Sequence, residues 1–207
     1  MIKKKKWCLR GEKMKKYEEE HYQFKNIKSS IYPWIKESLV DHQALNGKYI
    51  SEKDTPLVSF VGDLMIVFVI KRGEDSYEIV KDNMLPPDCD IAELYHTACE
   101  NLARDVEFVV SHTWYGGFGI VADGIHEASA LCFQHIWDVC AQKLGEDLAI
   151  MAPSTDIVLF VKAGDHELVK QMRTFGEEAF DRSRDKISKT ILIYTKEGKE
   201  LRIYEED

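Results

Sequence analysis

Hydrophobic and polar positions follow two alternating patterns along the chain. Short runs with the alternating or continuously apolar character of β-strands cover residues 57–61, 63–71 and 77–81. A stretch in which apolar residues recur every three or four positions comes next, as in a helix with one buried face. The order of strand, strand and helix then appears twice more, and the chain ends in two further strands.

Helical spacing predicts three helices in this part of the chain. Asp90 is a residue type that caps helix N-termini, so the first helix is expected to run from there to about residue 104. A second helix is predicted over 125–144, where Gly145 ends it, and a third begins near Asp165. The predicted buried face of the first helix consists of Ile91, Leu94, Tyr95, Ala98 and Leu102.

The remaining strands come in closely spaced pairs: 107–111 with 118–122, 148–152 with 157–162, and 190–195 with 200–204. Short connections favour hairpins and therefore antiparallel pairing. Each helix must cover a sheet face. We therefore predict an α+β fold over 56–207, in which repeated strand–strand–helix units form a largely antiparallel sheet covered by helices. The apolar run 64–70 is typical of a strand buried on both faces.

The N-terminal part is predicted to be an α-helical extension over 14–55. A charged helix is expected at 12–28, and 31–35 should interrupt it because Pro33 lacks an N–H donor. Residues 43–55 are polar and expected to be irregular. Residues 1–13 are expected to form a disordered basic tail, and Met14 is an alternative to Met1 as the natural start.

Charge is distributed unevenly over the 207 residues. The net charge is −8, but residues 1–28 hold ten Lys and Arg against four Glu, so the rest of the chain carries −14. An acidic body repels the phosphate backbone, which argues against nucleic acid as a partner and favours a basic protein.

Cysteine usage and hydropathy bear on the compartment. The five scattered cysteines form no CxxC pair, which is typical of reduced thiols in a cytoplasmic protein. The longest apolar run is only strand-sized, so no membrane span is predicted. No metal site and no cofactor are predicted either, because Cys132, His135 and Cys140 are interleaved with apolar residues and His126 lacks the second histidine of a zincin motif.

A glycine-rich turn at 111–119 is the first candidate site. Gly116 and Gly117 permit unusual backbone angles, and His112, Trp114 and Tyr115 lie beside them. The turn is either a loop that presents aromatic and imidazole groups to a ligand, or a hairpin turn with a glycine bulge.

The second candidate is the segment 123–127 at a strand-to-helix junction. Asp123 and His126 could supply acid–base or metal chemistry, and the helix N-terminus beside Gly124 and Glu127 could bind a small anion. The alternative is that Asp123 caps the helix, Gly124 relaxes the chain entry and Glu127 favours the first turn.

Three short segments resemble a known family. They are Ala-Cys-Glu-Asn-Leu at 98–102, Asp123-Gly124 with Ala128-Ser129, and Pro-Ser-Thr-Asp-Ile-Val-Leu at 153–159. With this spacing the chain resembles the YtpQ-like family of bacterial proteins over 57–201, while 114–119 and His126-Glu127 depart from the family pattern. The resemblance implies an α+β protein of the bacterial cytosol and assigns no catalytic residue, because the family has no established activity.

Two functions are compatible with these features. The first is a non-enzymatic binding or regulatory module, such as an adaptor or immunity-like protein, whose acidic surface meets a basic partner. The second is a small hydrolase or transferase that acts on an anionic small molecule at 111–127. The enzyme hypothesis requires His112, Asp123 and His126 to surround one open pocket.

Overall fold

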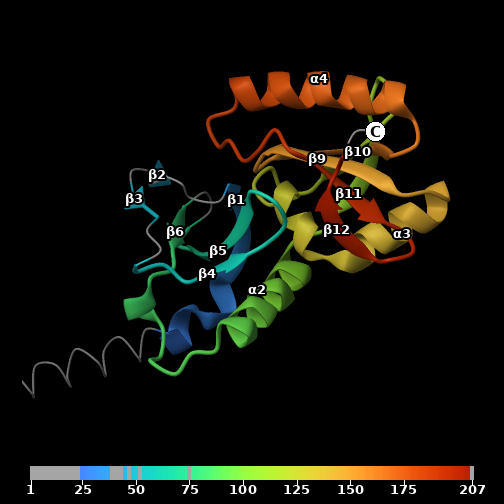
Figure 1. Cartoon of the computed structure of the whole chain (residues 1–207). Coiled ribbons are helices and arrows are strands. Elements are labelled where there is room, and N and C mark those ends of the chain that lie inside the picture. Colours follow the sequence, from blue (N-terminus) through green and yellow to red (C-terminus); the bar gives the residue numbers. More distant parts are fainter. Residues whose placement is uncertain (1–23, 38–43, 46–47, 51–52, 74–75, 206–207) are drawn as a thin grey trace, which may run out of the picture.

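The computed structural model of the chain describes residues 24–37, 44–45, 48–50, 53–73 and 76–205. The fold is α+β, as predicted, and every strand pair in the described residues is antiparallel. The strands form two main sheets and a small hairpin (Figure 1). The hairpin pairs β2 (Ala44–Leu45) with β3 (Lys48–Tyr49).

The first main sheet has four strands. Its order is β1 (Ile31–Glu37), β5 (Leu64–Lys71) and β4 (Leu57–Ser59), and β6 (Tyr77–Ile79) also pairs with β5. Seven of the eight β5 residues are buried, which confirms a strand covered on both faces.

The second main sheet has six strands and joins three hairpins. Its order is β12 (Glu200–Ile203), β11 (Ile191–Thr195), β9 (Leu148–Ser154), β10 (Ile157–Lys162), β8 (Phe118–Val121) and β7 (Val109–His112). The three hairpins were predicted, but their assembly into a sheet separate from the first was not. The reason is that local spacing specifies which neighbours pair and says nothing of which hairpins then join.

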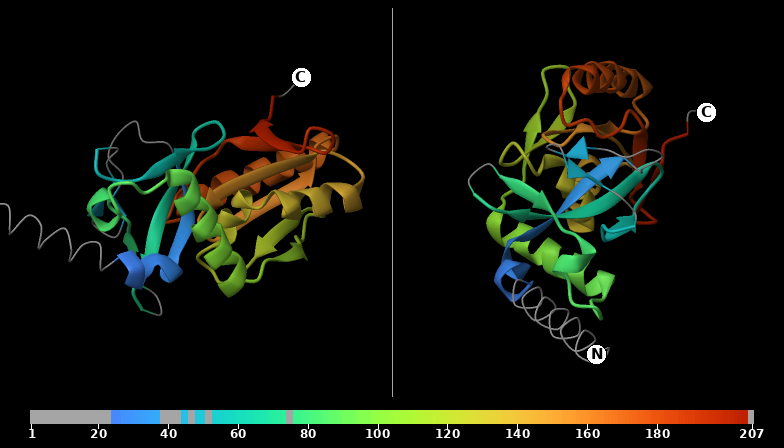
Figure 2. Two further views of the ribbon diagram at one scale, coloured as in Figure 1. Left: turned by 90° about the horizontal axis from the view of Figure 1, so that it is seen from below. Right: turned by 90° about the vertical axis from the view of Figure 1, so that its left-hand side faces the viewer.

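The helices that accompany the sheets are α2 (Ile91–Asp105), α3 (Gln134–Leu144), α4 (His166–Arg182), η1 (Lys28–Ser30), η2 (Asp82–Met84) and η3 (Glu127–Cys132). In Figure 1, α4 covers one face of the six-stranded sheet and α3 lies on the other. Alternate β9 residues contact the two helix layers: Leu148 and Ile150 belong to the core cluster that contains Trp137 of α3, and Met151 to the cluster under α4. The two sheets lie side by side in Figure 2, and Ile35 and Ile66 of the first share a core with Phe160 of the second.

Two of the predicted helices have the expected caps. The Asp90 carboxylate accepts a hydrogen bond from the Ala92 N–H at 2.8 Å, and Asp165 accepts one from the Leu168 N–H at 3.1 Å. Within α2 the predicted stripe is correct at Leu94, Ala98 and Leu102, which are buried, whereas Ile91 in the first turn is exposed.

Residues 31–35 interrupt the helix as predicted, but they do so as part of a strand, so the α-helical extension predicted over 14–55 is wrong there. β1 pairs with β5 along its whole length, from Ile31 opposite Ile70 to Glu37 opposite Leu64. Pro33 is compatible with a strand because β1 lies at the edge of its sheet, where a missing N–H breaks no ladder bond. The strand lies before residue 56, where the α+β pattern had been expected to begin.

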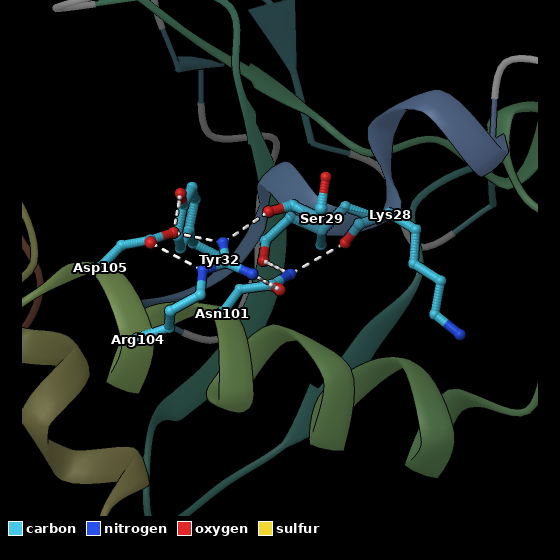
Figure 3. Close-up of polar contacts among 7 residues, drawn as sticks. Lys28, Ser29, Tyr32, Asn101, Arg104 and Asp105 are labelled. Atoms are coloured by element: carbon cyan, nitrogen blue, oxygen red, sulfur yellow. Dashed lines mark hydrogen bonds and ion pairs between the residues drawn. The ribbon is translucent and has the colours of Figure 1, made fainter.

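Side chains from α2 and η3 bind carbonyl groups on the outer edge of β1, and Figure 3 shows those from α2. The Asn101 amide donates to the carbonyl oxygens of Lys28 and Ile31 at 2.8 and 2.9 Å. The Ser129 hydroxyl donates to the Pro33 oxygen at 2.7 Å. This edge is therefore closed by protein side chains, as a buried strand edge must be.

The second predicted helix is divided in two. The expected segment 125–144 contains η3 and then α3, separated at Phe133. Polar groups of η3 bind neighbours instead of continuing one helix: the Ala128 N–H donates to the Thr155 oxygen at 3.0 Å, and Ser129 binds β1. Gly145 does end α3, in the left-handed conformation with φ of 81°.

Part of the N-terminal prediction lies outside the described residues. Of the helix expected over 12–28, only residues 24–28 are described, and 24–27 are helical. The tail predicted for 1–13 lies outside the described residues. Within 43–55, which is described in part, β2 and β3 pair where an irregular segment was predicted. Among the helices that are described, none has the length and apolar character needed to cross a membrane.

Candidate functional site

The predicted site residues occupy the β7–β8 hairpin and the loop that leads from β8 into η3. The hairpin extends to the edge of the six-stranded sheet, whereas η3 packs between the two sheets and contacts β1, β8 and β10. The hairpin is therefore the outer part of the region and is largely exposed, whereas η3 is the inner part and is largely buried.

The glycine turn is a three-residue hairpin loop. The Thr113 N–H donates to the Gly117 oxygen at 2.9 Å, and the Gly116 N–H returns to the Thr113 oxygen at 3.3 Å. Gly116 has φ of 92°, the left-handed position of a hairpin with a glycine bulge. A Cβ on Gly117 would lie 2.8 Å from the Val161 side chain. Both glycines thus have structural reasons to be present, as the second of the two interpretations proposes.

Trp114 and Tyr115 form a small aromatic cluster with Phe175 of α4 at the tip of the hairpin. The Tyr115 ring stacks on Phe175 with centroids 4.9 Å apart, and the Trp114 ring meets Phe175 edge-on at 4.7 Å. Tyr115 is half-buried, and burial raises the pKa of its hydroxyl. Trp114 remains 82% exposed, so its ring is available to a partner.

His112 lies on the outer strand and does not join the other candidate residues. It is exposed and contacts the Phe118 ring, with centroids 4.9 Å apart. It pairs with Phe118, whereas the loop of Asp123 follows Val121 at the other end of β8. Three residues of extended strand place those ends about 10 Å apart.

Asp123 caps the loop and holds a histidine. One carboxylate oxygen accepts hydrogen bonds from the N–H groups of Ile125 and His126, at 3.1 and 3.0 Å. The other lies 2.8 Å from His126 Nδ1. Burial acts to raise the pKa of Asp123, but the bonds from His126 and Ile125 outweigh it and leave the pKa below its usual range. The carboxylate thus binds backbone N–H groups, but it does not cap a helix as the second interpretation expected: the helix that follows is η3, whose N-cap residue is His126 and has no side-chain cap bond.

His126 is enclosed by aromatic rings. Its side chain is 1% exposed, and the ring centroids of Tyr32 and Tyr77 both lie 5.4 Å away, with that of Trp34 at 6.3 Å. Burial lowers the pKa of His126, and the neighbouring Asp123 carboxylate only partly opposes this. Because Nδ1 faces the Asp123 carboxylate, the neutral ring carries its proton there, and Nε2 has no hydrogen-bond partner among the described residues. His126 therefore has no open face for a substrate.

Glu127 is also directed inward. One carboxylate oxygen accepts hydrogen bonds from the N–H groups of Ala122 and Gly124, at 3.0 and 2.8 Å, and so closes the loop around Gly124. Gly124 has φ of 83°, which explains glycine at this position. The second Glu127 oxygen is buried without a partner in the described part of the chain. Glu127 thus stabilises the loop and does not present its charge to solvent.

β1 also places an ammonium group, that of Lys36, beside the Trp34 indole in the interior, and neither residue was predicted to belong to a site. Lys36 is 3% exposed, and its Nζ lies 5.4 Å from the Trp34 ring centroid. Burial lowers the pKa of Lys36 to about 8, and the negative charge of Asp185 only partly opposes the shift. Because 31–35 was predicted only to interrupt a helix, the alternation that places Tyr32, Trp34 and Lys36 on one face of a strand was not part of that prediction.

Metal binding has no support in the described residues, where His, Cys, Asp and Glu side chains form no group of three or more that could hold an ion. Cys89, Cys99, Cys132 and Cys140 are free thiols.

Comparison with known proteins returned no matching family model, no matching curated protein and no matching solved structure. The proposals below therefore depend on the geometry and chemistry of this chain alone.

Proposed function

We propose that this protein is a non-enzymatic binding or regulatory module, adaptor-like or immunity-like, whose acidic surface binds a basic partner protein in the bacterial cytoplasm. The observation that carries the proposal is the separation of the candidate acid–base groups. His112 is exposed on the outer strand, while His126 is enclosed by aromatic rings at the other end of the hairpin. An acid–base site needs such groups within hydrogen-bond reach of one substrate.

Charge supports a basic partner. The chain outside residues 1–28 carries a net charge of −14, and a surface potential of that sign accelerates encounters with positively charged proteins. The free thiols at four cysteines favour a reducing compartment.

The alternative, a small hydrolase or transferase acting on an anionic small molecule at 111–127, has less support. Asp123 is engaged by His126 and two backbone N–H groups, and Glu127 by two more. An anion at this loop would meet two carboxylates, which would repel it.

The test is capture of partners from a bacterial lysate on immobilised full-length chain, followed by mass spectrometry of bound proteins and metabolites. The expected result is a basic protein whose retention weakens as salt rises, because screening reduces long-range attraction between exposed charges. A second column carries a variant in which the exposed residues Glu107 and Glu167 are replaced by Gln. It should retain less of the basic protein. Turnover of a metabolite pool without any retained protein would overturn the proposal.

A further inference from the structure

β7 is an outer strand whose edge is open. It is the last strand of the six-stranded sheet, and β8 is its sole neighbour among the described strands. All four of its residues, Val109–His112, are exposed. An open edge presents backbone donors and acceptors to which another extended chain can bind.

The hairpin geometry identifies the free backbone groups. Thr113 and Gly117 are joined by the 2.9 Å bond from Thr113 N–H, and antiparallel pairs alternate between bonded and non-bonded. Ser111 and Val109 therefore bond to β8, whereas the N–H and C=O groups of Val110 and His112 point away from the sheet.

Two of the four β7 side chains, Val109 and Val110, are exposed and apolar; the other two are Ser111 and His112, and the strand carries no carboxylate, lysine or arginine. Val109 and its cross-strand partner Val121 are 50% and 52% exposed on one face, and Val110 is 45% exposed on the other. The opposite edge strand, β12, carries Glu200 and Arg202, charged residues of the kind that discourage edge pairing. Exposed valines on an open strand are what an added strand would cover.

The two ends of β7 differ in chemistry. Glu107 lies two residues before Val109, and Asp123 two residues after its partner Val121, so both exposed carboxylates flank the same end. Trp114 is exposed at the other end. A segment beside β7 would meet negative charge at one end and an aromatic ring at the other.

We propose that β7 is the docking site for an extended segment of a basic partner protein, which pairs with β7 as an added strand. The segment has apolar residues in the middle and a lysine or arginine at the end that meets Glu107 and Asp123. This inference rests on the proposed function and adds the surface and the chemistry of its occupant. A second copy of this chain fits less well, because each copy brings a net charge of −8 and the same acidic end.

The experiment uses the full chain labelled with ¹⁵N and a synthetic peptide of alternating valine and threonine with a lysine at each end. The amide signals of Val110 and His112 are expected to shift, and their hydrogen exchange to slow about tenfold or more as backbone bonds form. A peptide N-methylated at alternate residues is expected to bind about tenfold more weakly, since it lacks the donors and leaves the protein unaltered. Val110→Lys should also weaken binding, whereas Ile203→Lys, at an equally exposed position on β12, should not.

Different failures have different meanings. Binding that spares Val110 and His112, or that survives N-methylation, overturns docking on β7 but leaves a basic partner in place. A peptide with glutamates at both ends that binds β7 equally well overturns the basic partner while docking stands. A dimer in sedimentation that Val110→Lys converts to monomer overturns the proposal in favour of a second copy.

Discussion

β1 and β7 are both outer strands, but side chains bind outward carbonyl groups of β1, whereas β7 is exposed. On β1 the outward carbonyls of Ile31 and Pro33 receive hydrogen bonds from Asn101 and Ser129, and six of the seven residues are buried. On β7 all four residues are exposed, and valine side chains flank outward backbone groups. Since unpaired strand edges favour association, the bonded edge of β1 contributes to the fold, and the exposed edge of β7 is the one proposed above as a docking site.

The same contrast separates the two histidines. His126 packs against the β1 face and is withdrawn from solvent, whereas His112 lies on β7 and is exposed. Burial on the β1 side should make stability sensitive to substitution there, and exposure on the β7 side should make substitutions there nearly neutral. The following experiments test this contrast.

Leu102→Ala should have the largest effect. Leu102 is fully buried in the core cluster that contains Tyr32 and Trp34 of β1, so the truncation should lower the free energy of unfolding by about 2–5 kcal/mol. Val109→Ala on β7 is the control and should change it by less than about 0.5 kcal/mol. Urea denaturation measures both, and a loss below about 1 kcal/mol for Leu102→Ala would contradict the contrast.

Lys36→Met should stabilise the protein. Burial lowers the pKa of Lys36 to about 8. Below pH 8 the buried side chain is charged and lowers the free energy of unfolding, and this loss decreases as the pH rises from 8 towards the pKa of the unfolded chain, near 10.5. The gain from Lys36→Met should approach about 3 kcal/mol at pH 7 and shrink above pH 8.

The matched control for this substitution is Lys71→Met, at an exposed position on β5, which should change the free energy of unfolding by less than about 0.5 kcal/mol. Thermal denaturation at pH 7 and pH 10 separates the two variants. If both substitutions changed the free energy of unfolding equally at the two pH values, burial of the charged Lys36 side chain would not destabilise the protein.

Asn101→Ala should have an intermediate effect. It removes the donors to Lys28 and Ile31, leaves the Ile31 carbonyl on the β1 edge unpaired, and should cost about 1–3 kcal/mol. Gln134→Ala removes a comparable amide-to-carbonyl bond, to Lys199, at an exposed position and should cost about 1 kcal/mol or less. Similar losses in the two variants, measured in urea, would show that closing the β1 edge matters no more than an exposed bond.

The smallest expected effect concerns pH. The pKa of His126 is lowered by burial, so its unfolded form takes up a proton near pH 6.5 before the folded form does. The free energy of unfolding is therefore highest above pH 6.5 and decreases as the pH falls below 6.5. The melting temperature of His126→Gln should fall less between pH 7 and pH 5 than that of the wild type, whereas exposed His96→Gln should retain the wild-type slope.

Much of the fold followed from local patterns. The caps at Asp90 and Asp165, the end of α3 at Gly145 and the three hairpins of the six-stranded sheet all depend on groups a few residues apart, which a sequence displays directly. The glycine bulge was one of two interpretations of the turn at 111–119 and is present at Gly116.

Other features depend on residues far apart in the chain. Pro33 predicted only that a helix is interrupted at 31–35; that this segment is a strand depends on β5, with which it pairs, and on Ser129, 96 residues away, which binds the Pro33 oxygen. The second helix divides because η3 gives its N–H and hydroxyl groups to Thr155 and Pro33. The rings of Tyr32 and Trp34 on β1 also lie beside His126, far from them in the sequence. Helix caps and hairpins arise from short-range geometry, but the closure or exposure of an edge depends on which distant segments pack against it, and only the assembled structure settles that.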